Sequence, residues 1–131
     1  MINFETLKRT HKPNNYLVAD RENCPNARAD REPPVLAHPP ATVHAAWEAV
    51  TARQARTIRT DGDSDTMTYE YVQRSALFRF PDTITIRFLD AGQGRTKLLI
   101  YSASKVGYSD MGVNRRRVSD WLSALEAELL A

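Results

Sequence analysis

The sequence has little of several features that would point to a specialised class of protein. Cys24 is the only cysteine among 131 residues, so no disulfide can form within the chain. Its apolar runs are only a few residues long, which predicts no membrane-spanning helix. The formal net charge is only +2, well short of a non-specific DNA-binding domain. We therefore expect no specific nucleic-acid partner.

The residues that are present have the composition of an ordinary globular domain. Hydrophobic residues make up 42% of the chain and charged residues 26%, which is typical of a soluble folded protein. A chain of this length can bury a sufficient core without a disulfide. The first residues lack the apolar run of a signal peptide, so we expect a cytoplasmic protein. A periplasmic or membrane-anchored protein is the alternative if the N-terminus is truncated.

The sequence pattern predicts one strand, one helix, four strands and a second helix. Residues 1–34 are expected to form an extended arm, because proline and asparagine interrupt them throughout. Residues 34–40 read as a short extended segment that forms an edge strand, and residues 41–53 have helical apolar spacing. The four strands are predicted at 55–60, 66–73, 82–90 and 96–104, and the last helix at 114–131.

These elements predict an α+β fold, a two-layer sandwich with an antiparallel sheet of four to five strands. Both helices carry a single apolar stripe, so both are expected to pack on one face of the sheet in the order β-α-β4-α. The predicted organisation is therefore an arm, residues 1–34, and a single domain, residues 35–131. The other sheet face is left toward solvent or a partner, and its residues are Thr68, Glu70, Thr85 and Arg87.

The densest polar stretch of the chain connects the last strand to the last helix. Ser102 and Ser104 lie two residues apart on a strand, so their hydroxyls point to the same face. Asn114 is predicted to be the N-cap of the helix. The three arginines that follow it have the wrong sign for the helix dipole, which predicts an anion nearby. That anion is either a side chain, namely Asp110, Glu70 or Asp82, or a bound ligand.

Two segments resemble the family catalogued as domain of unknown function 1499. They are "SALFRFPDT", residues 75–83, and "YSASKVGYSDMGVNRRRV", residues 101–118. The second matches the family's Ser-Ala-Ser-Arg-Val-Gly-Tyr-Ser-Asp-Leu-Gly-Val-Asn-Arg-Arg run, with Lys105 for arginine and Met111 for leucine. In the first, Asp82 stands at the first of two family aspartates and Thr83 replaces the second. Family members often have a segment with two cysteines near the N-terminus, and this chain keeps only Cys24-Pro25 of it. The resemblance implies a fold and a motif, without a mechanism.

The candidate site is the region around the end of the last strand. The candidate ligand-binding residues are Ser102, Ser104, Lys105, Tyr108, Asp110, Asn114, Arg115 and Arg116. A neighbouring apolar connector is interpreted as a plug for the core, as a lip over a ligand cavity or as a docking patch, and its residues are Phe78, Arg79, Phe80 and Asp82. The same polar pattern is also typical of an ion-pair network at a strand–helix corner.

The function that these patterns favour is a non-enzymatic binding module for a small anionic or amphiphilic ligand. Such a module should have an internal cavity lined by Tyr69, Tyr71 and Phe88 and opening near Tyr108. The alternatives are a protein-interaction or scaffold domain, which a solid core would favour, and a hydrolase-type enzyme on an anionic substrate. No serine lies in a motif that carries a base, and the histidines lack zinc spacing. We expect no metal and no cofactor.

Overall fold

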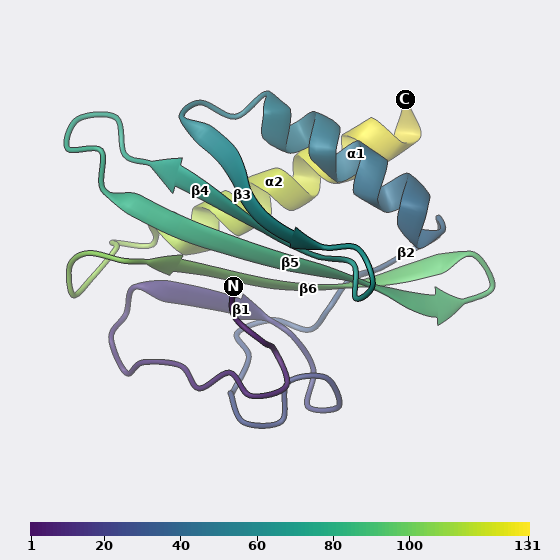
Figure 1. Ribbon diagram of the computed structural model, residues 1–131, viewed down its shortest axis with the longest axis horizontal. Coiled ribbons are helices and arrows are strands. Elements are labelled where there is room, and N and C mark those ends of the chain that lie inside the picture. The colour runs from purple at the N-terminus through teal and green to yellow at the C-terminus, as the bar shows by residue number, and fades with distance from the viewer.

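The computed structural model describes residues 1–131 and contains one antiparallel sheet and two helices (Figure 1). The strands are β1 (Asn15–Val18), β2 (Val35–Leu36), β3 (Thr57–Asp63), β4 (Thr68–Arg74), β5 (Pro81–Gly92) and β6 (Arg95–Ser104). The helices are α1 (Pro40–Ala52) and α2 (Val113–Leu130). The predicted α+β class is therefore confirmed.

The sheet has the strand order β1-β6-β5-β4-β3. The short strand β2 also pairs with β6, beside residues 96–97, whereas β1 pairs with residues 100–103. These two strands consequently lie one after the other along the same edge of β6. The opposite edge is β3, whose pairing with β4 shifts register between Arg59 and Asp61.

Both helices lie over one face of the sheet, as their apolar stripes predict (Figure 1). Trp47 of α1 and Trp121 of α2 meet edge to face, with their ring centroids 5.8 Å apart. Sheet and helices share one cluster of 16 buried hydrophobic residues. The expected cavity lining, Tyr69, Tyr71 and Phe88, belongs to this cluster, and each of these residues is at most 6% exposed. Side chains therefore fill the space where an internal ligand was expected.

The opposite face of the sheet carries a second core, which contradicts the prediction that this face is open. Residues 1–34 run across it, as Figure 1 shows in purple and blue. Thr68 and Thr85, expected toward solvent or a partner, are only 6% and 2% exposed. The cause is β6, which is apolar on both faces and therefore needs cover on both. The second core consists of Phe4, Leu7, Leu17, Ala19, Cys24, Leu99 and Tyr101.

Two connections meet at one end of the sheet. Arg74, the last residue of β4, pairs with Pro81, the first residue of β5, and Asp82 pairs with Ser104 at the end of β6. The antiparallel register therefore brings residues 75–80 next to residues 105–112. Both connections are at the left in Figure 1.

Candidate functional site

A buried polar network lies just below this end of the sheet. Ser102 and Asn114 are 0% exposed, and the Ser102 hydroxyl donates to Asn114 Oδ1 over 2.7 Å. Asn114 Nδ2 lies 2.9 Å from Ser104 Oγ, 2.7 Å from Asp110 Oδ2 and 3.1 Å from the Asn14 carbonyl oxygen. One amide side chain thus connects β6, α2, the preceding loop and the N-terminal arm.

Arg117 completes this network, although the sequence pattern had suggested its two neighbours instead. Its Nη1 donates to Asn114 Oδ1 at 2.7 Å and to Ser102 Oγ at 3.1 Å. Its Nη2 donates to Asp82 Oδ2 at 2.7 Å, and its Nε donates to Gln73 Oε1 at 2.6 Å. Asp82 is therefore one of the predicted acidic partners of the arginine run. The signal for Arg117 was its position on the buried stripe of the helix, three residues after Asn114 and four before Trp121.

Asp110 forms no ion pair with the arginines, and instead it performs the capping that was predicted for Asn114. The prediction was wrong because α2 starts earlier, with Gly112 as N-cap and Asn114 inside the first turn. Asp110 accepts the backbone N–H of Gly112 at 2.8 Å and that of Asn114 at 3.3 Å. Burial alone raises the pKa of the Asp110 carboxyl, but the hydrogen bonds from Asn114 and Gly112 outweigh it and hold this pKa below its usual value.

The hydrogen bonds of this network hold structural elements together, and we call the network the joint. Its residues are Asp82, Ser102, Ser104, Asp110, Asn114 and Arg117. The hydroxyls of Ser102 and Ser104 contact an amide and a guanidinium, and neither contacts a carboxylate or an imidazole. A serine nucleophile needs such a base within hydrogen-bond reach. The network therefore fixes the strands and the helix from which the two loops project.

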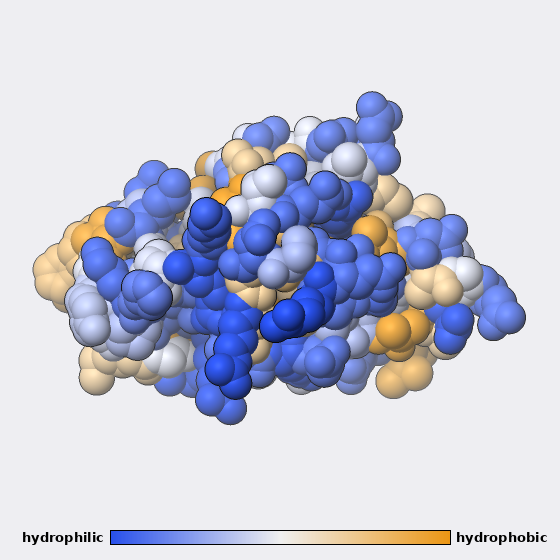
Figure 2. Space-filling view, turned by 90° about the horizontal axis from the view of Figure 1, so that it is seen from below, coloured by the Kyte–Doolittle hydropathy of each residue, from blue (hydrophilic) through white to orange (hydrophobic).

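Above this joint, exposed apolar side chains gather on the two loops. We define the loop end as residues 74–80 and 105–116. Seven of the eleven large hydrophobic residues that are exposed in the whole chain lie there, at 39–85% exposure. They are Leu77, Phe78, Phe80, Val106, Tyr108, Met111 and Val113. Figure 2 shows hydrophobic residues at the left end of the molecule, beside a hydrophilic middle.

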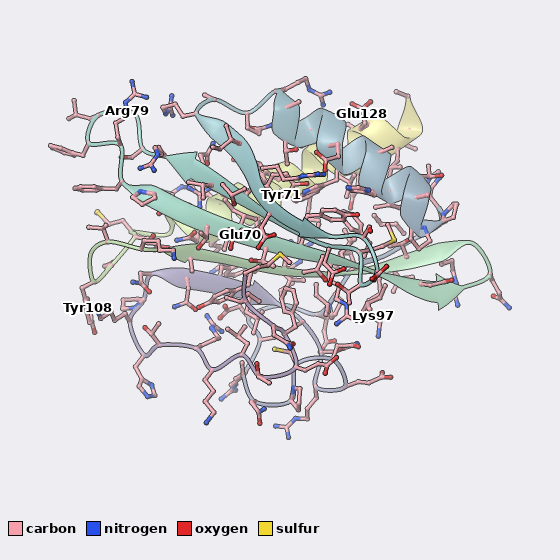
Figure 3. All side chains as sticks on the ribbon, in the orientation of Figure 1. Glu70, Tyr71, Arg79, Lys97, Tyr108 and Glu128 are labelled. Carbon is pink, nitrogen blue, oxygen red and sulfur yellow. The ribbon has the colours of Figure 1, made fainter.

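The free charges of the loop end are positive. Five cations are exposed there without forming an ion pair, namely Arg74, Arg79, Lys105, Arg115 and Arg116. Two nearby carboxylates, Asp82 and Asp110, are held in the network below, whereas Asp120 is exposed on α2 beside Arg116. Figure 3 labels Arg79 and Tyr108, which project from the two loops at the same end of the molecule.

A groove of about 430 Å³ runs between the arm and the second loop. Asp110 and Arg115, both candidate ligand-binding residues, line it together with Lys12 and Arg9. Arg9 pairs with Asp30 at 2.6 Å, so Lys12 and Arg115 are the cations of the groove that form no ion pair.

The structure thus divides the candidate residues into two groups. Ser102, Ser104, Asp82, Asp110 and Asn114 belong to the buried joint, where protein groups bind them. The others are exposed on the loop end, namely Phe78, Arg79, Phe80, Lys105, Tyr108, Arg115 and Arg116. Contact of either group with a ligand stays a prediction.

The sequence profile of the family described as Protein of unknown function (DUF1499) matches residues 8–125. The chain belongs to this family. The match spans most of the arm, the whole sheet and most of α2, so this DUF1499 protein shares more with the family than the two motifs that first indicated it. No curated protein and no solved structure matches the chain.

Proposed function

We propose that this protein is a non-enzymatic binding module for an anionic amphiphile, which it binds at the loop end. The observation that carries the proposal is the combination of seven exposed apolar side chains with five cations that form no ion pair. Large apolar side chains that are exposed together in one region of a domain are a mark of interaction sites. Acyl chains would cover this apolar surface, while guanidinium and ammonium groups would bind an anionic head group.

The joint below the loops supports this proposal. Arg117 and Asn114 connect β4, β5, β6 and α2, so the bases of both loops are fixed before any ligand arrives. A preorganised site loses less conformational entropy on binding than a flexible one. The groove beside the second loop places Lys12 near Arg115, which adds one further cation for an anionic head group.

A protein-interaction role is the second candidate, and the packed core between helices and sheet favours it over a ligand held in an internal cavity. The exposed rings of Phe78 and Phe80 stack with their centroids 5.4 Å apart, and stacked aromatic residues are frequent anchors in protein interfaces. The sheet face that was predicted to meet a partner is covered by the arm, so the partner would have to bind elsewhere.

Titration with a short-chain lipid that stays monomeric in water tests the proposal. Dihexanoyl phosphatidylglycerol and dihexanoyl phosphatidylcholine have the same acyl chains and differ in net charge. We expect the anionic lipid to bind and to raise the free energy of unfolding by about 2.7 kcal/mol at one hundred times its Kd. The zwitterionic lipid and inorganic phosphate should bind much more weakly, because each lacks one of the two contacts.

Two double variants provide the comparison. K105A/R116A removes two cations of the loop end, whereas R21A/R95A removes two exposed cations elsewhere on the surface. The first should lose the stabilisation by the anionic lipid, and the second should keep it. Equal binding of both lipids, or equal behaviour of both variants, would refute the proposal.

A further inference from the structure

We infer that the amphiphile is part of a bilayer, and that the loop end docks on membrane surfaces that contain anionic lipid. This inference rests on the proposed function. It names the physical form of the ligand, which is a lipid surface rather than a single molecule in a pocket.

The shape of the loop end favours a surface as its partner. A small ligand is usually enclosed in a concave, mostly apolar pocket. Here the apolar side chains project from two separate loops, as the placement of Arg79 and Tyr108 illustrates (Figure 3). The groove beside them is polar apart from Tyr16 and Pro13. The helix–sheet interior is packed with side chains. A projecting apolar end without an enclosing wall fits a broad, deformable partner.

The residue types suit the boundary between head groups and acyl chains. Phe78, Phe80 and Tyr108 supply aromatic rings, which are enriched at membrane interfaces. Lys105, Arg115 and the other free cations lie around them, where they can meet anionic head groups while the rings insert. Two of the carboxylates that could repel such a surface, Asp82 and Asp110, are bound internally, and Asp120 lies beside the cation Arg116. No helix of the structure has the length and apolar character needed to cross a bilayer, so contact is at the surface.

The backbone of both loops adds an independent observation. Arg79 has φ 59° and Met111 has φ 53°, which is a left-handed backbone conformation that residues other than glycine rarely adopt. Met111 is also 85% exposed, so no packing of its side chain compensates for this conformation. Residues in this conformation are frequent at ligand-binding sites, although Arg56, Met67 and Gln93 share it outside the loop end. Each of the two loops therefore holds an exposed side chain in an unfavourable backbone conformation at the proposed contact.

Co-sedimentation of the full chain with vesicles tests the inference. The vesicles are pure phosphatidylcholine or phosphatidylcholine mixed with phosphatidylglycerol. We expect binding to the mixed vesicles to be at least about tenfold tighter, and to weaken as NaCl is raised, because salt screens the cations. Removing one cation of the loop end should lower the affinity about fivefold.

Matched variants separate insertion from simple charge attraction. F78S/F80S removes two exposed rings of the loop end, and I58S removes an apolar side chain that is 66% exposed on β3. The first variant should lose at least about tenfold in vesicle affinity and the second should bind like the wild type. Y108S is a further variant in the other loop, in case F78S/F80S folds poorly. Thermal unfolding checks that each variant is folded.

The two lipid experiments give distinguishable outcomes. Binding of mixed vesicles that depends on Phe78, Phe80 and Lys105 supports the inference. Binding of monomeric dihexanoyl phosphatidylglycerol without binding of vesicles overturns the inference and leaves the proposed function intact. Absence of both overturns both and leaves the protein-interaction role. Equal binding of neutral and anionic vesicles, or full binding by F78S/F80S, also overturns the inference.

Discussion

Replacing Arg117 by alanine should cost this protein a large part of its stability. The Arg117 side chain is 8% exposed and that of its partner Asp82 is 14% exposed, so the ion pair is largely shielded from water. R117A removes the ion pair and also the donors to Ser102, Asn114 and Gln73. Two of these three acceptors, Ser102 and Asn114, are 0% exposed, so water cannot replace the lost hydrogen-bond donor.

The size of the effect follows from these contacts. Removing one partner of a buried ion pair costs about 3–5 kcal/mol, because the other charge stays behind without compensation. Asp82 keeps some access to water, which places R117A near the lower limit, at about 3 kcal/mol. Domains of this kind have about 5–15 kcal/mol of total stability, so the variant should still fold. Its Tm should fall by about 10 °C.

Urea denaturation followed by the fluorescence of Trp47 and Trp121 measures this effect, because both rings are buried in the core that the network borders. R115A is the control, since Arg115 is exposed and should change stability by less than about 0.5 kcal/mol. The double variant D82N/R117A should cost less than the sum of D82N and R117A by more than about 1 kcal/mol. A loss for R117A as small as that of R115A, or strict additivity in the cycle, would refute this account of the joint.

Three further predictions concern acid stability, the second core and the strained loop. The pKa of Asp110 is lowered in the folded protein, so its stabilisation is present above about pH 4 and is lost as the pH falls through the folded pKa. D110N should therefore lose less stability on acidification than the wild type in urea denaturation, and parallel pH profiles would contradict this. L99A should cost about 2–5 kcal/mol, because Leu99 is 0% exposed under the arm; a change below about 0.5 kcal/mol would mean that this face is open. M111G should raise the Tm by relieving the left-handed conformation and should weaken vesicle binding; a lower Tm would show that Met111 is not strained.

The sequence predicted the helical layer well because that layer follows simple periodicity. Val43, Trp47 and Val50 recur at helical spacing, and all three are buried in the structure. Tyr69 and Tyr71 lie two residues apart on β4, and both face the helices. Such patterns depend only on which face of a helix or strand is apolar, so the buried face can be predicted without knowing which element packs against it.

The second core was missed because its partners are distant in the sequence. Leu98, Leu99, Ile100 and Tyr101 form a continuous apolar run, which is typical of a strand that is buried on both faces. That run was the available signal. The covering residues Phe4 and Leu7 sit in an irregular segment without periodicity, and no local rule indicates which face such a segment will cover.

The sequence predicted which residues lie around the end of the last strand, but not the contacts that each of them makes. Asn114 has the residue type of an N-cap, but tertiary contacts decided otherwise, since its amide links Ser102 to the arm and Asp110 caps the helix instead. The local sequence pattern also does not predict that the side chains of the two loops are exposed. Phe78 and Phe80 are as apolar as core residues, and only the register of β4 with β5 shows that they project past the end of the sheet.

The arrangement of the sheet edges has a consequence for copies that would be crowded on the proposed lipid surface. Copies concentrated there meet side by side, and an unpaired strand would invite polymerisation by edge-to-edge hydrogen bonding. One margin of the sheet offers only the short strands β1 and β2. The other, β3, is interrupted by the irregularity between Arg59 and Asp61 and carries a second carboxylate at Asp63. Neither edge is therefore a regular template for hydrogen bonding to another copy.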